Sequence, residues 1–157
     1  MDSDLNCHCP CGKNRFNVSG EPLVRAFCHC TICQSFYQGP YSDITFFRVK
    51  DVKGPKGNSV EFNKIWIPPF IRRGKCVNCG KPVINYLEMF PLPKLAIIAS
   101  ANIYDKTLVP EPSLHIFYDT RVADVDDKLP KYSGYLKSEF AIGHRVIATL
   151  MQSDKKR

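Results

Sequence analysis

Residues 76–82 read Cys76-Val77-Asn78-Cys79-Gly80-Lys81-Pro82, and this stretch decides how we expect the chain to fold. A second segment, Cys9-Pro10-Cys11-Gly12, repeats its design, with two closely spaced cysteines on a tight turn followed at once by glycine. The glycine lets the backbone curl so that amide N–H groups face the thiolates. We therefore expect one tetrahedral structural zinc ion, which closes a loop of more than 60 residues and is held by Cys9, Cys11, Cys76 and Cys79.

A third cluster, Cys28-His29-Cys30-Thr31-Ile32-Cys33, offers three sulfurs from six residues. Zinc with three protein ligands keeps a fourth position for water or an incoming ligand, and it lowers the pKa of the group bound there. We expect a second zinc ion with such an open position, held by Cys28, Cys30 and Cys33, and we place any chemistry there. Two alternatives stay open: Cys7 or a histidine closes this site as purely structural, or it carries an iron–sulfur cluster with one distinct iron.

The other candidate ligands receive weaker assignments. Cys7 is the one cysteine outside the three motifs, and no role is assigned to it. His8 and His29 sit next to cysteine ligands, a position that tends to aim their side chains away from the same ion. We expect each of these two histidines either to lie around a metal site without binding the ion or to be exposed to solvent. His115 is expected to be packed in a strand, and His144 to lie on the surface of a helix.

Composition indicates one globular domain that is soluble and sits in a reducing compartment, the cytoplasm. The chain has 157 residues, of which 44% are hydrophobic, and its longest apolar run, Leu95 to Ala101, is far too short to span a bilayer. The acidic start contains no apolar stretch typical of a secretory signal. In a reducing compartment the thiols stay free to bind metal. We expect two zinc ions per chain.

The formal net charge of +7 raises the question of an acidic partner. Two filled sites, of four and three thiolates, would reduce it to about +4. The basic residues form small groups rather than one stripe, at Lys50/Lys53/Lys56, Arg72/Arg73/Lys75 and Lys155/Lys156/Arg157. Most of them are expected to be solvated, with one group as a candidate anion site. A nucleic-acid partner is therefore not favoured but stays open.

Short runs of β-branched and aromatic residues, separated by proline and glycine turns, predict a mainly β fold. The expected strands are Arg15 to Val18, Leu23 to Phe27, Ile44 to Val49, Val60 to Phe62, Ile65 to Ile67, Val83 to Leu87, Leu95 to Ala99 and Leu114 to Tyr118. From Tyr135 the spacing becomes helical, and the expected apolar positions are Leu136, Phe140, Ile142, Val146, Ile147 and Leu150. We expect a zinc domain over residues 1–134, followed over 135–157 by an amphipathic helix with a basic tail.

The ordered motifs resemble the glutathione-dependent formaldehyde-activating enzyme and centromere protein V family. The resemblance rests on Cys9-Pro10-Cys11-Gly12 with Arg15-Phe16-Asn17-Val18, on Phe27 to Gln34, on Arg73 to Val83, and on His115-Ile116-Phe117 with Asp127 to Gly134. It implies a β-tent fold of several short antiparallel sheets clamped by zinc. It also implies the same division of ligands, with Cys9, Cys11, Cys76 and Cys79 on the structural ion and Cys28, Cys30 and Cys33 on the second.

The family's named reaction is of the carbon–sulfur lyase type and joins glutathione and formaldehyde into S-hydroxymethylglutathione. The resemblance thus implies glutathione or another small thiol as one partner and a small carbonyl compound as the other. Two alternatives from different classes stay open beside this enzyme. One is a non-catalytic zinc module for a protein or nucleic-acid partner, and the other is a carrier of glutathione or metal. The fold and the zinc motifs alone do not decide among the three.

Overall fold

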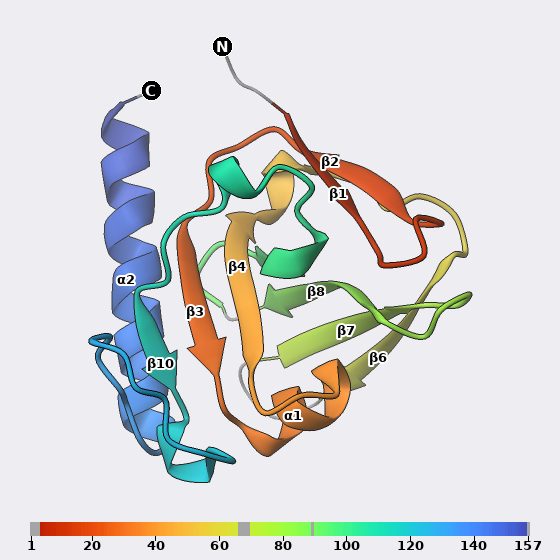
Figure 1. Ribbon diagram of the computed structural model, residues 1–157. Coiled ribbons are helices and arrows are strands. Elements are labelled where there is room, and N and C mark those ends of the chain that lie inside the picture. The colour runs from red at the N-terminus through yellow and green to blue at the C-terminus, as the bar shows by residue number, and fades with distance from the viewer. Residues whose placement is uncertain (1–3, 66–69, 89, 157) are drawn as a thin grey trace.

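The computed structural model describes residues 4–65, 70–88 and 90–156 and confirms a mainly β fold that ends in a helix (Figure 1). The strands are β1 (Leu5–His8), β2 (Arg15–Val18), β3 (Val24–Cys28), β4 (Ser42–Arg48), β5 (Val52–Lys53), β6 (Val60–Ile65), β7 (Phe70–Cys76), β8 (Pro82–Glu88), β9 (Leu95–Ala99) and β10 (Leu114–Ile116). The α-helices are α1 (Thr31–Tyr37) and α2 (Tyr135–Lys155), and four short 3-10 helices complete the described elements: η1 (Val49–Asp51), η2 (Ser100–Asn102), η3 (Lys106–Leu108) and η4 (Tyr118–Thr120).

The strands form two sheets. The larger has seven strands in the order β10-β3-β4-β9-β8-β7-β6, and the smaller has three in the order β1-β2-β5. Strand pairs are antiparallel, except that β10 runs parallel to β3. Figure 1 shows a strong twist, so that β6 and β7 run across the direction of β3 and β4. The twist brings β7 across the end of β3, so that Arg73 of β7 lies beside Cys33, which follows β3 in the chain.

Strand register assigns the side chains of the large sheet to two different cores. Phe46 lies opposite Ile97, and Ile97 lies opposite Asn85, so these three share one face. The neighbouring pair, Phe47 and Ala96, points to the other face. The first face packs with α2 in one core, and the second packs with β1 and β2 of the small sheet in another. The seven-stranded sheet is therefore the middle layer of the molecule.

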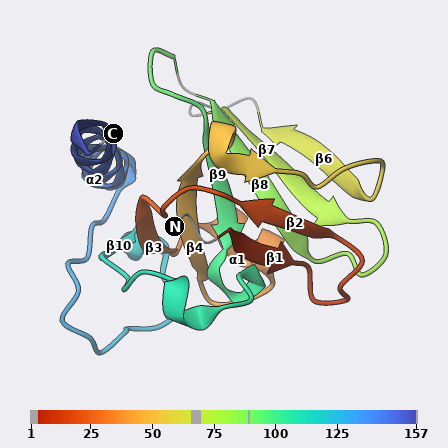
Figure 2. The ribbon, with the colours of Figure 1, turned by 90° about the horizontal axis from the view of Figure 1, so that it is seen from above.

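Helix α2 lies along the β10 and β3 side of the large sheet (Figures 1 and 2). Its buried face is formed by Ser138, Ala141, Ile142, Val146 and Leu150. Leu136 and Phe140, which the helical spacing places on the apolar stripe, are instead 79% and 77% exposed. Among the described residues, no helix is both long enough and apolar enough to cross a membrane.

Two polar contacts explain why α2 turns this face inward. Ser138 Oγ accepts a 2.8 Å hydrogen bond from the amide of Phe117, whose backbone has a positive φ of 54°. At the other end of the helix, buried Arg48 of β4 donates to the Leu150 carbonyl and pairs with Asp154. Hydrogen bonds at both ends fix the rotation of the helix, which apolar spacing alone leaves undecided.

Ser138 provides a direct test of this packing. Replacing Ser138 by alanine leaves the part-buried amide of Phe117 without its acceptor, which we expect to lower the free energy of unfolding by about 1–3 kcal/mol. Replacing the exposed Leu136 of the same helix by alanine should change it by less than about 0.5 kcal/mol. Urea unfolding of both variants measures the two values. Equal losses would show that the helix packs through the stripe containing Leu136.

The sequence analysis did not predict β1, β5, β7 or α1. Strand β7 was missed because it contains Arg72, Arg73 and Lys75, whose charges interrupt the run of apolar residues that predicts a strand. Arg73 is nevertheless buried. The predicted strand Leu114 to Tyr118 is shorter than expected, because the left-handed conformation of Phe117 ends β10 at Ile116. In the predicted strand Ile65 to Ile67, Ile65 ends β6, while positions 66 and 67, like Pro68 and Pro69, lie outside the described residues.

Candidate metal centres

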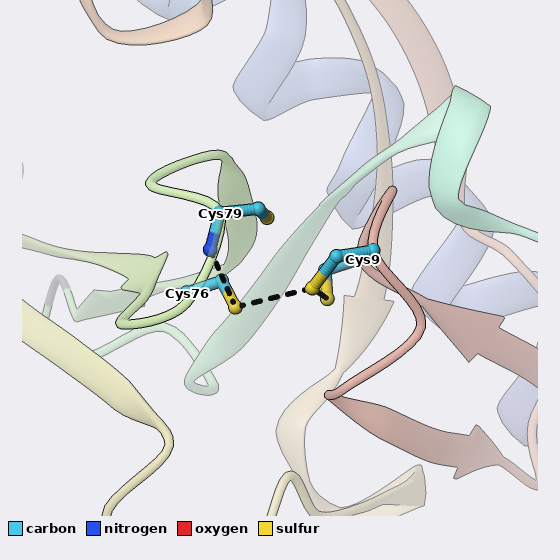
Figure 3. A group of neighbouring side chains, drawn as sticks. Cys9, Cys76 and Cys79 are labelled. Atoms are coloured by element: carbon cyan, nitrogen blue, oxygen red, sulfur yellow. Dashed lines mark hydrogen bonds between the residues drawn. The ribbon is translucent and has the colours of Figure 1, made fainter.

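The first cluster brings together four thiols from two distant turns. Cys9 and Cys11 lie in the turn between β1 and β2, while Cys76 is the last residue of β7 and Cys79 lies in the turn between β7 and β8. All four sulfur atoms lie within 4.8 Å of one another. Figure 3 shows Cys76 and Cys79 on one turn, facing Cys9 across the gap between the two hairpins. The four cysteines that the sequence analysis paired thus lie together, and they join the small sheet to β7 and β8 of the large one.

The two turns have the same local structure. The amide of Gly12 donates to the Cys9 carbonyl at 2.9 Å, and that of Gly80 donates to the Cys76 carbonyl at 2.8 Å. Both glycines have positive φ values, 74° and 69°, which other residues rarely adopt. Two amides point at sulfur: Asn14 N–H donates to Cys9 Sγ, and Cys79 N–H donates to Cys76 Sγ. Such bonds stabilise thiolates, the form in which cysteine binds metal.

Asn14 and Ser59 support this cluster and carry no motif that the sequence analysis could have recognised. Asn14 is buried, and its Nδ2 donates to the Ser59 carbonyl at 3.1 Å. The Ser59 hydroxyl in turn donates a short hydrogen bond to Asn14 Oδ1. This reciprocal pair ties the β1–β2 hairpin to the start of β6. A polar pair of this kind becomes visible only when the fold brings residues 45 positions apart into contact.

The second cluster is built on the junction between β3 and α1. Cys28 is the last residue of β3, Cys30 is the N-cap of α1, and Cys33 lies in the first turn of the helix. Their three sulfurs lie within 4.8 Å of one another, and the Cys33 amide donates to Cys30 Sγ at 3.3 Å. The helix was missed because the chain offers only seven residues for it, and Cys30 replaces the usual oxygen-bearing cap.

The chemistry of both donor sets fits a bound divalent metal ion. In the second cluster, hydrogen bonds from the two neighbouring cysteines, together with the charge of Arg73, hold the pKa of Cys33 well below its ordinary value. Hydrogen bonds with Cys30 and Cys33, together with burial, raise the pKa of Cys28. One thiolate thus forms readily, whereas three in one buried site repel each other. A cation among the sulfurs removes this repulsion, and sulfur ligands at this spacing suit zinc.

Arg73 brings a positive charge to the second cluster. It lies in β7, and both Nη atoms are 4.0 Å from Cys33 Sγ. Its side chain is buried at 8% exposure, its Nε has no hydrogen-bond partner, and its guanidinium lies 5.2 Å from the ring centre of Phe36. Within the described parts of the chain, no carboxylate pairs with it. The sequence analysis grouped this arginine with surface residues and so missed its place beside the sulfurs.

A chain of polar side chains runs behind the Cys28–Cys30 loop, from two buried histidines to Asp127 at the surface. His29 Nε2 is 2.8 Å from His115 Nδ1, and His115 Nε2 is 2.8 Å from an oxygen of Asp127. Both histidines are at most 1% exposed, and burial lowers the pKa of His29 to about 4. The hydrogen bond of Lys131, followed by that of His115, keeps the pKa of Asp127 low, at about 2. His29 therefore points away from the sulfurs, as predicted, and His115 is packed, as predicted.

The remaining cysteine and histidines have simpler surroundings. Cys7 lies in β1 opposite Phe16 and is part of the core between the sheets. Burial raises the pKa of its thiol to about 12, so it stays neutral, and it belongs to neither cluster. His8 is half-buried beside Cys9, with Nδ1 2.9 Å from the Cys9 carbonyl, and His144 is exposed on α2 as expected. Cys7 thus has a packing role.

A cavity of about 240 Å³ opens beside the second cluster. Cys28, Cys30 and Cys33 form part of its wall, Arg73 and Asn85 approach from β7 and β8, and Tyr135 and Glu139 approach from α2. Burial raises the pKa of Glu139. The first cluster has no contact with this cavity, because it lies on the opposite side of the twisted sheet. The two clusters thus differ in their surroundings: one lies between two hairpins, and the other borders a cavity.

Comparisons with known proteins agree with the sequence motifs. Residues 4–120 match the family profile described as glutathione-dependent formaldehyde-activating enzyme. The fold is similar to that in a crystal structure of a Rhodobacter sphaeroides protein, with a TM-score of 0.52 and 14% sequence identity, over 82% of this chain and 99% of that one. No curated protein matches the chain significantly. Helix α2 lies beyond the part that matches the family profile.

Proposed function

Because the chain belongs to the glutathione-dependent formaldehyde-activating enzyme family, we propose that it is a zinc-dependent enzyme of the carbon–sulfur lyase type. It joins a small thiol, glutathione or a related compound, to a small carbonyl compound. The observation that carries this proposal is the position of the Cys28, Cys30 and Cys33 sulfurs at the wall of a cavity. A cluster with a purely structural role has no need of such access.

In this proposal the two clusters hold different ions. Cys9, Cys11, Cys76 and Cys79 hold a structural zinc, and Cys28, Cys30 and Cys33 hold the second zinc. Zinc with three thiolate ligands, when bound, supplies a Lewis acid that lowers the pKa of an incoming thiol and polarises a carbonyl. The protein supplies the position of the ligands and the surroundings of the fourth place.

The side chains around the second cluster have definable tasks. Arg73 balances the negative charge of three thiolates, because both of its Nη atoms lie 4.0 Å from Cys33 Sγ. The cavity holds the carbonyl compound next to the thiol, so that much of the gain in rate comes from proximity. The buried pair of His29 and His115 fixes the Cys28–Cys30 loop from behind. Each task concerns position and charge.

Metal removal tests the proposal directly. We expect the zinc-loaded chain to accelerate formation of the adduct of glutathione and formaldehyde well above the uncatalysed rate, measured as loss of free thiol. Treatment with a chelator should return the rate to the uncatalysed value, and added zinc should restore it. A rate equal to the uncatalysed one at saturating zinc would contradict an enzymatic function.

Two further measurements identify the alternatives if the rate is not raised. Saturable binding of glutathione without turnover would identify a carrier. Retention on DNA or RNA that falls steeply with salt would identify a nucleic-acid module, because basic groups that contact phosphates release counterions. Under the proposed function, nucleic-acid binding is weak even at low salt, since the basic residues form separate small groups.

A further inference from the structure

The cavity beside Cys28, Cys30 and Cys33 has apolar walls. Most of its lining residues are aliphatic or aromatic; they include Ile44, Phe46, Ile71, Leu87, Ile97 and Ile142. The register of the large sheet explains this, because Ile71 lies opposite Leu87, and Phe46 lies opposite Ile97. Alternate residues of four adjacent strands therefore face the same space. Helix α2 covers the β10 and β3 side and supplies Ile142 as part of the opposite wall.

Polar residues are a minority in the wall of this cavity. Asn85 donates to the Tyr37 hydroxyl at 3.0 Å and accepts from the Gly74 amide. Its side-chain amide therefore already has hydrogen-bond partners within the protein. Among the described lining residues, Arg73 is the only one with a permanent positive charge, and its Nε is unpartnered. The permanent charge in the wall therefore lies beside the sulfurs, and Glu139 of α2, whose pKa is raised by burial, adds one further ionisable group.

This arrangement does not suit the body of glutathione. The tripeptide carries two carboxylates, an ammonium group and two amides, whereas Arg73 and Glu139 are the charged side chains among the described lining residues, so most of its polar groups would be buried without a partner at a high cost. It does not suit formaldehyde alone either, because two heavy atoms leave most of a 240 Å³ space empty. An apolar cavity of about 150 Å³ is large enough for benzene, so this one has room for an aromatic ring with a short side chain.

Resting on the proposed function, we propose that this cavity binds the apolar body of an aldehyde, aromatic or of medium chain length, with its carbonyl group at the cysteine cluster. The thiol approaches from solvent and keeps its polar groups outside. The thiol sulfur forms a bond to the carbonyl carbon, the C=O double bond becomes a C–O single bond, and the thiol proton ends on that oxygen. The product is a hemithioacetal, and no oxidant or reductant is required.

A series of aldehydes with glutathione at fixed concentration tests this substrate class. We compare formaldehyde, propanal, butanal, hexanal and phenylacetaldehyde with the zinc-loaded full chain. Burial of each methylene contributes enough to raise kcat/KM by about fourfold until the cavity is full. Equal kcat/KM values for all of these aldehydes, or the highest value for formaldehyde, would overturn the proposal.

Two variants of the cavity wall separate this prediction from a defect in folding. Ile71 and Leu87 are half-buried, so changes at these positions are tolerated better than in the centre of the core. Ile71→Phe fills part of the cavity and should lower the kcat/KM ratio of phenylacetaldehyde to formaldehyde at least tenfold. Leu87→Ala enlarges it and should move the optimum to a longer aldehyde. Leu108→Phe, outside the cavity, is the matched control, and a ratio that changes equally in all three variants would contradict the assignment.

Binding of an unreactive compound distinguishes failure of this inference from failure of the proposed function. We use 2-phenylethanol in calorimetric titrations of the zinc-loaded chain and of Ile71→Phe. Binding that Ile71→Phe abolishes, in a chain without turnover, would support the apolar cavity while overturning the enzymatic function. Turnover of formaldehyde without binding of 2-phenylethanol would leave the enzymatic function intact and overturn the apolar substrate class.

Discussion

Replacing Cys76 by serine is expected to remove most of the folding stability of the chain. The cluster of Cys76 with its three partners is the direct link between the β7–β8 turn and the β1–β2 turn. A structural zinc contributes about 10 kcal/mol in apparent terms, and domains of this size are stable by only about 5–15 kcal/mol. We therefore expect the variant to be unfolded, or to melt about 20–40 °C below the intact chain.

Cys7→Ala is the matched control for this experiment. Cys7 is as deeply buried as Cys76 and lies in the same core, but it belongs to neither cluster. Its loss removes one buried sulfur and should cost about 1–2 kcal/mol, which corresponds to a few degrees. Thermal unfolding by circular dichroism, with zinc in slight excess, measures both variants. Similar melting temperatures for Cys76→Ser and Cys7→Ala would contradict a structural metal at this cluster.

Replacing Cys30 by serine should have a different effect from Cys76→Ser: we expect this variant to lose activity and to keep its fold. Cys30 lies at the junction of β3 and α1, and the second cluster spans only six residues, so it closes no long loop. Loss of a thiolate ligand weakens the metal that activates the thiol. A Lewis acid of this kind lowers the free-energy barrier of the rate-limiting step by several kcal/mol. We expect thiol-dependent turnover to fall at least about a hundredfold.

Thr31→Ser controls for this second variant, because Thr31 is exposed in the same turn. It should keep its zinc content, its melting temperature and its turnover. Zinc analysis after gel filtration should give about one zinc less per chain in Cys30→Ser than in the intact chain. If Cys30→Ser keeps full turnover, the second cluster is not the place of the reaction. If it unfolds as Cys76→Ser does, the second cluster also clamps the fold.

The clusters could be predicted from the sequence because their chemistry is local. Each motif places two or three sulfurs within a few residues, and Gly12 and Gly80 mark the turns that aim them. The pairing of the two distant turns followed from the number of ligands that zinc needs. The mainly β fold and the C-terminal helix followed from alternating and helical patterns.

The surroundings of the second cluster could not be predicted in the same way. Arg73 reads as one charge in a basic group, and its burial follows only from the register that sets β7 beside β8. The orientation of α2 depends on Ser138 and Arg48, whose contacts join segments that are distant in the sequence. Charge and apolar spacing are properties of single segments, whereas these contacts are properties of pairs brought together by the fold.

The measurement that tests the central claim most directly is a titration with glutathione combined with zinc analysis. The claim is that one cluster is a closed site of four sulfurs and the other keeps a position for a thiol. The intact chain should contain about two zinc ions and bind glutathione at about one site, and Cys30→Ser should contain about one zinc and bind none. Equal glutathione binding by both chains, or two zinc ions with no glutathione bound to the intact chain, would contradict the open site.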